Sequence, residues 1–326
     1  MVILMTHNQR YNIYIASCNE NGGIYHYILG ENGKLTQKGF TLMDRPMYLK
    51  VHNGKMYILL RAPFESNAES GLICYDIDKK GALTNPSQII STKGEVACHL
   101  EVNDDKIYCV NYISGSIVSL PDGKLVKHRG KGVNAKRQES AHTHFVCETP
   151  DEKYLAVTDL GLDTVFLYDK ELNCISKAKV PDGHGVRHLI FDEEYCFSAN
   201  ELESTLSVFK YNNGKLEIVD TVSLLPEDFS DESTASAIRF ENGRIYVSNR
   251  GHNSISVLEY KNSKLKNLGT FSSFGAFPRD FDIIGNYIIS TNELSNSVTV
   301  LDKETKECID TVEVTSPVCV VYTDLE

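Results

Sequence analysis

Tryptophan is absent from this 326-residue sequence, and this absence argues against repeats of the WD type. No run of about 18 apolar residues occurs either, which excludes a membrane-spanning helix. The segment from Met1 to His7 has no basic start, no long apolar core and no small-residue cleavage site, so we expect no signal peptide. We therefore expect a protein without a membrane partner.

Paired cysteines are missing as well. The nine cysteines are an odd number and show no Cys-x-x-Cys spacing. Most of them stand in apolar strand patterns, where cysteine behaves as a small buried hydrophobic residue. Because disulfide bonds are rare in reducing compartments, this usage indicates a cytoplasmic protein.

Several familiar catalytic motifs are absent. The sequence contains no Gly-x-Ser-x-Gly elbow, no Walker loop and no His-Glu-x-x-His pair. The formal net charge of −11 works against nucleic-acid binding as a bulk property, although it allows a local basic pocket. We predict neither a cofactor nor a nucleic-acid partner, and oligomeric state cannot be derived from these features.

What the sequence does contain is one phrase repeated along the chain. A short apolar run ends in Asn or Asp, a few small polar residues follow, and an alternating strand comes next; the clearest copies span 245–260 and 287–301. Copies recur at intervals of roughly 41 to 50 residues, a period typical of β-propeller blades. The residues that end the apolar runs, called anchors below, are Asn19, Arg61, Asn111, Asp159, Asn200, Asn249 and Asn292.

Seven copies predict an all-β, seven-bladed β-propeller that occupies residues 1–326 as a single domain. Each repeat holds four short strands, so each blade is expected to have four antiparallel strands with the first one innermost. The segment 316–323 resembles an innermost strand without a blade behind it, whereas the N-terminal repeat lacks one. We therefore expect the C-terminal strand to complete the first blade and hide both edges.

Strand direction predicts which side chains meet at the central channel. In an up-and-down blade, the start of the first strand and the end of the second lie on the same face. Arginines, a histidine and carboxylates at a channel mouth suit an anionic small molecule with a carbonyl group to polarise. The residues brought to this face are His144, Arg187 and Arg279 from first strands, and Asp159, Glu201, Arg250 and Glu293 from second strands.

Each of these residues also has a structural interpretation. The anchor asparagines could cap turns, Glu201 and Glu293 could form structural ion pairs, and a histidine of the pair at 142 and 144 could simply be satisfied by the adjacent blade. Calcium would be repelled by the nearby arginines, so we predict no metal. The basic run 124–137 and the acidic stretch 226–232 are interpreted first as solvated loops.

Six phrases carry a family resemblance: Ala141-His-Thr-His144, Gly185-Val-Arg-His-Leu-Ile-Phe191, Ala199-Asn-Glu-Leu-Glu-Ser-Thr205, Leu225-Pro-Glu-Asp-Phe-Ser-Asp231, Ser248-Asn-Arg-Gly-His-Asn-Ser254 and Phe277-Pro-Arg-Asp-Phe281. In this order they resemble the bacterial seven-bladed-propeller 6-phosphogluconolactonases, a lactonase family that also includes fungal carboxymuconate cyclases. The resemblance implies opening of 6-phospho-D-glucono-1,5-lactone by water.

The resemblance also implies roles for individual residues. It assigns His144, Arg187, Glu201 and Arg250 to catalysis, with either His144 or Glu201 as proton acceptor. The substrate-binding residues are predicted to be Arg279, His142 and Asp159; Arg279 would hold a phosphate with help from the 124–137 run, and His142 is the alternative to His144. Two other functions stay open: a cyclase or lactonase for another carboxylated lactone, and a non-catalytic propeller that binds a ligand or protein.

Overall fold

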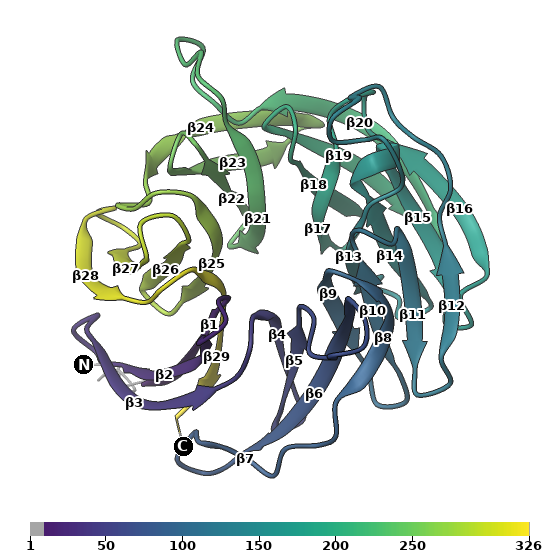
Figure 1. Cartoon of the computed structure of the whole chain (residues 1–326). Coiled ribbons are helices and arrows are strands. Elements are labelled where there is room, and N and C mark those ends of the chain that lie inside the picture. The colour runs from purple at the N-terminus through teal and green to yellow at the C-terminus, as the bar shows by residue number, and fades with distance from the viewer. Residues whose placement is uncertain (1–9, 326) are drawn as a thin grey trace, which may run out of the picture.

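Seven antiparallel sheets surround a central axis in the computed structural model, which describes residues 10–325 (Figure 1). The segment Met1–His7, for which we expect no signal peptide, lies outside these residues. The predicted seven-bladed propeller is confirmed, and in every blade the first strand lies nearest the axis. Blade 1 contains β29 (Pro317–Asp324), β1 (Tyr11–Ser17), β2 (Gly23–Leu29) and β3 (Leu35–Leu42).

Blades 2 and 3 follow along the chain. Blade 2 departs from the predicted four strands because β7 and β8 both pair with β6, which gives five. Its strands are β4 (Pro46–His52), β5 (Lys55–Leu60), β6 (Glu69–Ile77), β7 (Leu83–Thr84) and β8 (Ile90–Glu95). Blade 3 contains β9 (Ala97–Val102), β10 (Ile107–Asn111), β11 (Ser116–Leu120) and β12 (Lys124–Lys127), so the basic run 124–137 begins as a strand and not as a loop.

The remaining four blades are regular. Within residues 10–325 the only helical element is the 3-10 turn η1 (Leu160–Leu162), and no helix is long and apolar enough to cross a membrane. The strands are β13 (Thr143–Glu148), β14 (Tyr154–Asp159), β15 (Thr164–Asp169) and β16 (Cys174–Lys179) in blade 4; β17 (Val186–Asp192), β18 (Tyr195–Asn200), β19 (Thr205–Asn212) and β20 (Lys215–Ser223) in blade 5; β21 (Thr234–Glu241), β22 (Arg244–Arg250), β23 (Ser254–Lys261) and β24 (Lys264–Ser272) in blade 6; and β25 (Pro278–Ile284), β26 (Tyr287–Asn292), β27 (Ser297–Asp302) and β28 (Cys308–Glu313) in blade 7.

Apolar residues at alternate strand positions join each blade to the next. Ile245 and Val247 of β22, for example, pack in one buried cluster with Phe197 and Ala199 of β18 in the preceding blade. Burying a side chain of this size contributes about 1.5–3 kcal/mol relative to leaving it exposed. The core is therefore a set of clusters between blades, and the channel itself is free to carry polar groups.

The anchor Asn19 caps a turn, since its Oδ1 accepts from the backbone N–H of Asn21, whereas Asn200 and Asn249 have a different structural role. The Nδ2 of Asn200 donates to the hydroxyls of Thr205 and Ser207, at 3.0 and 2.8 Å, and Asn249 makes the equivalent bonds to Ser254 and Ser256. Ser256 in turn donates to the carbonyl of Leu224, in the segment that enters the blade. Asn200 and Asn249 thus join the second and third strands of a blade.

The two ends of the described chain meet in blade 1, as predicted. The strand β29 pairs antiparallel with β1 along its length, with Val320 opposite Ile15 and Cys319 opposite Ala16. Val318, Cys319 and Val320 are all buried. The innermost strand of the first blade is therefore supplied by the last strand of the chain, and the sheet has no open inner edge.

We expect a chain ended at Ser316 to fail to fold. This truncation removes β29 and with it three buried apolar side chains, each of which contributes about 1.5–3 kcal/mol. The usual net stability of a domain is only about 5–15 kcal/mol. The truncation would also expose the edge of β1. Soluble yield and thermal unfolding by circular dichroism measure the effect. A chain ended at Asp324, which keeps β29, is the control; equal melting temperatures for the two chains would contradict a closing role for β29.

One irregularity recurs in every innermost strand and prepares the site. In blade 5, Val186 pairs with Asn200 and His188 pairs with Ala199, so Arg187 stands between them without a cross-strand partner. Such a β-bulge bends the strand and turns the extra side chain in a new direction. The register shifts at the same place in all blades, and the bulged residues are Val318, Met47, Cys98, His144, Arg187, Ser236 (with Ala237) and Arg279.

Candidate functional site

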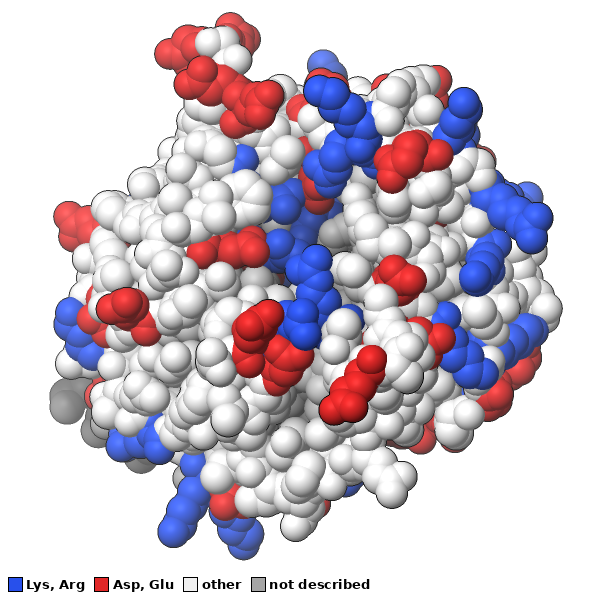
Figure 2. All heavy atoms as spheres, viewed as in Figure 1, with Lys and Arg blue, Asp and Glu red and all other residues white. Residues whose placement is uncertain are grey.

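A cavity of about 370 Å³ opens at the mouth of the central channel. Figure 2 shows Lys and Arg side chains gathered in the central hollow of this face. Its lining residues are Met47, Arg61, Val96, Cys98, Tyr112, Ile113, Arg137, His144, Glu201, Arg250 and Arg279. Below it a narrow space is lined by six of the seven bulged positions, all but Ser236. The repeated bulge thus sets the floor of the channel.

A larger groove lies elsewhere. It has a volume of about 710 Å³, runs along β2, β3 and the β6–β7 turn, and shares no lining residue with the channel cavity. Its charged lining residues are the lysines Lys38, Lys79 and Lys80. The candidate site is the smaller cavity, because the predicted arginines, histidine and carboxylate converge there.

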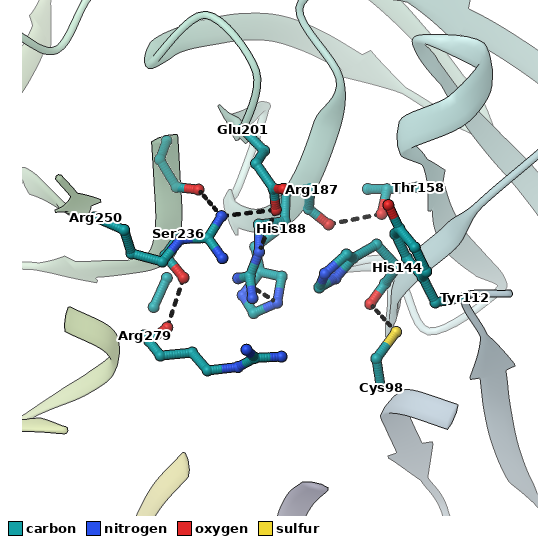
Figure 3. A network of polar contacts seen from close by, with 12 residues as sticks. Cys98, Tyr112, His144, Thr158, Arg187, His188, Glu201, Ser236, Arg250 and Arg279 are labelled. Atoms are coloured by element: carbon teal, nitrogen blue, oxygen red, sulfur yellow. Dashed lines mark hydrogen bonds and ion pairs between the residues drawn. The ribbon is translucent and has the colours of Figure 1, made fainter. Parts of the chain in front are cut away.

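One buried carboxylate holds three guanidinium groups. Glu201 follows β18, and its Oε2 lies 3.0 Å from Nε of Arg187 and 2.8 Å from Nη2 of Arg250 (Figure 3). Its Oε1 accepts from Nη2 of Arg137, which comes from the loop before β13. Glu201, Arg187 and Arg250 are each less than 9% exposed. Because these three side chains are shielded from water, each charge is stabilised mainly by its ion-pair partners.

The charges in this cluster control protonation. Burial alone would raise the pKa of Glu201, but the adjacent guanidiniums, Arg250 first, hold that pKa well below its usual range. Burial and the nearby Arg250 lower the pKa of Arg187, which stays charged at neutral pH. A carboxylate so firmly ionised is a poor proton acceptor, and its chief effect is to position the arginines.

The imidazole of His144 differs from the carboxylate of Glu201 in its charge and in its ability to accept a proton. Burial, followed by the field of Arg187, lowers the pKa of His144 well below its ordinary value, so the ring is neutral at neutral pH. Its Nδ1 is buried and has no hydrogen-bond partner among residues 10–325. The ring lies against Tyr112 and His188, with centroids 5.7 and 5.3 Å away. A neutral imidazole at the channel wall can accept a proton.

A contact within blade 5 fixes the side chain of Arg187, and a contact from blade 4 fixes its backbone. Its Nη1 lies 2.9 Å from Nε2 of His188, the next residue of β17, and its carbonyl accepts a 2.7 Å hydrogen bond from Thr158 of blade 4. Burial lowers the pKa of His188 well below its ordinary value, so this ring is neutral and can accept the bond. The guanidinium is thereby aimed along the channel wall.

Arg279 enters the channel from blade 7, the neighbour of blade 6, which carries Arg250. Its Nη1 lies 2.9 Å from Oε2 of Glu293, and its carbonyl accepts from Ser236 of blade 6 at 2.6 Å. Figure 3 shows its side chain extending toward the middle of the channel. Arg279 and Glu293 are therefore at the mouth, where strand direction predicted them.

Three predicted site residues are not among the lining of the mouth cavity: Arg187 lines the narrow space below it, and Asp159 and His142 line neither. The carboxylate of Asp159 lies 2.6 Å from Nδ1 of His128 and accepts from the backbone of His142 and Leu162. Asp159 occupies the anchor position, which points between strands, whereas the position after it faces the channel. The ring of His142 stacks on Tyr112, 4.5 Å away, so it supports a lining residue from behind.

Sequence reasoning missed Tyr112, Cys98 and the role of Arg137. Tyr112 follows anchor Asn111 as Glu201 follows Asn200, so the repeat phase could have found it. Cys98 holds the bulged position of blade 3, and its thiol donates to the carbonyl of His144 at 3.3 Å. Arg137 had no such signal, because the path of its loop depends on tertiary contacts.

Those contacts show that the 128–142 segment is not simply a solvated loop. His128 bonds to Asp159 and, at 2.7 Å, to the hydroxyl of Tyr168. Gln138 donates to Asp163 at 2.8 Å and to the carbonyl of Leu160 at 2.9 Å. Both side chains are buried. They bring Arg137 within reach of Glu201.

The described residues offer no metal centre. Among residues 10–325 no group of three or more His, Cys, Asp or Glu side chains is placed to hold an ion. The nine cysteines all lie in this range and none is in a disulfide bond.

The chain is a seven-bladed propeller with a buried arginine–glutamate–histidine cluster at its channel mouth, and sequence comparison gives its family. The sequence model described as "Lactonase, 7-bladed beta-propeller" matches residues 12–322. The chain belongs to this lactonase family. An uncharacterized protein of Staphylococcus aureus strain USA300 is 30% identical over 345 aligned residues, which cover 95% of this chain and 99% of the relative.

Solved structures agree with the fold. A protein from Bacteroides fragilis, provisionally named a 6-phosphogluconolactonase, is 24% identical with a TM-score of 0.86, and the match covers 98% of this chain and 99% of that one. The periplasmic gluconolactonase of Pseudomonas aeruginosa is 23% identical, also with a TM-score of 0.86, covering 97% and 100%. Likenesses of this degree establish the architecture alone.

Proposed function

We propose that this protein hydrolyses a phosphorylated sugar lactone, 6-phospho-D-glucono-1,5-lactone, to 6-phosphogluconate in the cytoplasm. The observation that carries the proposal is the charge of the cavity. Five guanidiniums stand against two carboxylates, an excess of three positive charges in a protein whose formal net charge is −11; Asp280, which also lines the narrow space, is paired with Arg239 and is left out of this count. A phosphate dianion together with the oxyanion of the transition state would balance that excess. The arginines counted are Arg61, Arg137, Arg187, Arg250 and Arg279, and the carboxylates are Glu201 and Glu293.

The mechanism uses His144 as the proton acceptor. A water molecule attacks the lactone carbonyl carbon while its proton passes to the neutral imidazole. The carbonyl oxygen becomes an oxyanion, which Arg187 and Arg250 stabilise. The oxyanion then re-forms the carbonyl as the bond to the ring oxygen breaks, and His144 returns the proton to that oxygen, giving a hydroxyl and a carboxylic acid that ionises. Glu201 stays ionised and holds the arginines in place.

Of the two alternative functions, only a lactonase or cyclase for a carboxylated lactone has specific support. A lactone bearing a carboxylate would also match a positive cavity, with one less charge balanced. A non-catalytic propeller would need no neutral histidine beside the arginines, so the unpartnered Nδ1 of His144 favours catalysis. The family name also favours lactone chemistry without fixing the substrate.

The deciding experiment follows opening of freshly made 6-phosphogluconolactone, unphosphorylated gluconolactone and a carboxylated γ-lactone, each against its uncatalysed rate. We expect strong acceleration of the phosphorylated lactone and weak acceleration of the neutral one. Preference for the carboxylated γ-lactone would replace the substrate, and acceleration of none would remove the enzymatic proposal. Control reactions contain Arg187→Ala, which removes a proposed oxyanion partner.

A further inference from the structure

Arg61 is the one cavity arginine whose guanidinium has no ion pair or side-chain hydrogen bond within residues 10–325. It directly follows β5, at the end of the second strand of blade 2. The prediction of Arg61 as an anchor was wrong by one residue, because Leu60 pairs with Pro46 as Asn200 pairs with Val186. Arg61 therefore holds the channel-facing position that Glu201, Arg250 and Glu293 hold in their own blades. Arg61 lines the mouth cavity and its side chain is exposed, so it can reach a ligand there.

The order of the blades places Arg61 across the channel from the reactive cluster. Innermost strands contact one another in sequence around the closed ring, from β29 through β4, β9, β13, β17, β21 and β25. In a ring of seven, blade 2 stands opposite blades 5 and 6, as Figure 1 shows. Glu201 directly follows the second strand of blade 5, and Arg250 is the last residue of the second strand of blade 6. A ligand that spans the mouth therefore touches Arg61 at one end and the reactive cluster at the other.

The wall beside Arg61 is apolar. Met47, Val96, Cys98 and Ile113 line the same cavity from blades 2 and 3 and the segments next to them. Neither cavity carboxylate comes from these two blades: Glu201 pairs with arginines of the reactive cluster, and Glu293 pairs with Arg279. A guanidinium with no competing carboxylate, next to an apolar wall, is suited to a monoanionic or dianionic group.

We propose that Arg61 binds the phosphate of the substrate, at the end farthest from the lactone carbonyl, and so determines the preference for phosphorylated lactones. This inference rests on the proposed function. It assigns the distal anion to blade 2, with Arg279 beside it, and leaves Arg137 to the Glu201 cluster instead of the phosphate.

Steady-state kinetics of Arg61→Gln test the assignment. We expect KM for 6-phosphogluconolactone to rise by about 10- to 100-fold, the range for losing a hydrogen bond between charged groups. We expect kcat to change by less than about threefold, since the reacting carbonyl lies across the channel. Constants for unphosphorylated gluconolactone should stay as in the wild type. Arg61→Lys keeps the charge without the planar fork and should fall between the two.

The matched control is Arg45→Gln. Arg45 is a nearby arginine of the same blade entry, but it pairs with Asp44 at 2.7 Å and does not line the cavity. It should leave both substrates unaffected. A wild-type preference for the phosphorylated lactone that survives in Arg61→Gln would overturn the inference while the proposed function stands.

Product binding separates the two proposals. Calorimetry with 6-phosphogluconate needs no turnover, and we expect Arg61→Gln to weaken its affinity by about 10- to 100-fold. If the wild type opens no lactone but binds 6-phosphogluconate through Arg61, the proposed reaction fails and the phosphate site remains. If the wild type binds no 6-phosphogluconate, or both proteins bind it equally, the phosphate site is wrong.

Discussion

Replacement of His144 by alanine is expected to lower kcat/KM for the phosphorylated lactone by about 10²- to 10⁴-fold, the usual contribution of a positioned general base. The ring is buried, neutral and beside Arg187, whereas the oxygens of Glu201 are occupied by guanidiniums. The measurement is initial rate with the wild type and His144→Ala at equal folded concentration. His142→Ala is the matched variant, since its ring stacks behind Tyr112, and we expect a loss of less than about tenfold. A larger loss for His142→Ala than for His144→Ala would reverse the two assignments.

The pH profile gives the same assignment independent support. The pKa of folded His144 lies well below 6.5, so the base stays active from neutral pH down through 6.5 and is lost only as the pH falls through that lower value.

The buried rings of His99 and His188 have lowered pKa values as well. Unfolded histidines take up protons below about pH 6.5 while these do not, so each costs about 1.4 kcal/mol of stability per pH unit there. Circular dichroism at each pH must therefore accompany the rates. An acid limb centred at or above pH 6.5 with the fold intact would contradict a neutral, buried base.

Arg187→Ala is the second change with a large expected effect, a fall in kcat of about 10²- to 10³-fold, as for the loss of one oxyanion donor. Glu201 would keep Arg250 and Arg137, so it would not become an unpaired buried charge. Arg187→Lys keeps a charge but cannot contact Glu201 and His188 in the same plane, and we expect it to recover little activity.

The control for Arg187 is Arg239, a half-buried arginine whose carboxylate partners lie in blade 7. Arg239 bonds to Asp280 at 2.9 Å and to Asp282 at 3.2 Å, and lines neither channel cavity. Removing it leaves two carboxylates without their cation, so Arg239→Ala should lower the melting temperature more than Arg187→Ala. An Arg187→Ala protein that keeps activity within tenfold of the wild type would assign Arg187 to structure.

The sequence predicted the site wherever a residue's position follows from the repeat. His144, Arg187 and Arg279 share one place in the first strand, and Glu201, Arg250 and Glu293 share one place after the second, so phase and strand direction sufficed. Asp159 failed because it stands one residue earlier, where side chains point between strands. Arg137 and the extra strand β8 depend on tertiary contacts of long segments, about which a local pattern carries no information. The bulge itself was also invisible, since its register shift depends on pairing between strands.

The recurring bulge gives each innermost strand at least one residue that takes no part in the cross-strand pairing. Each bulged residue lacks a partner in the pairing ladder, so the strand pairing does not depend on its side chain, although Val318, Met47 and Cys98 also pack in the buried apolar clusters. In this chain three neighbouring blades carry Val318, Met47 and Cys98 there, while His144, Arg187 and Arg279 occupy others on the same backbone. Six of the seven bulged positions thus line one narrow space in the channel. A substitution at His144, Arg187 or Arg279 can therefore change what the channel binds while the strand pairing of the ring is kept.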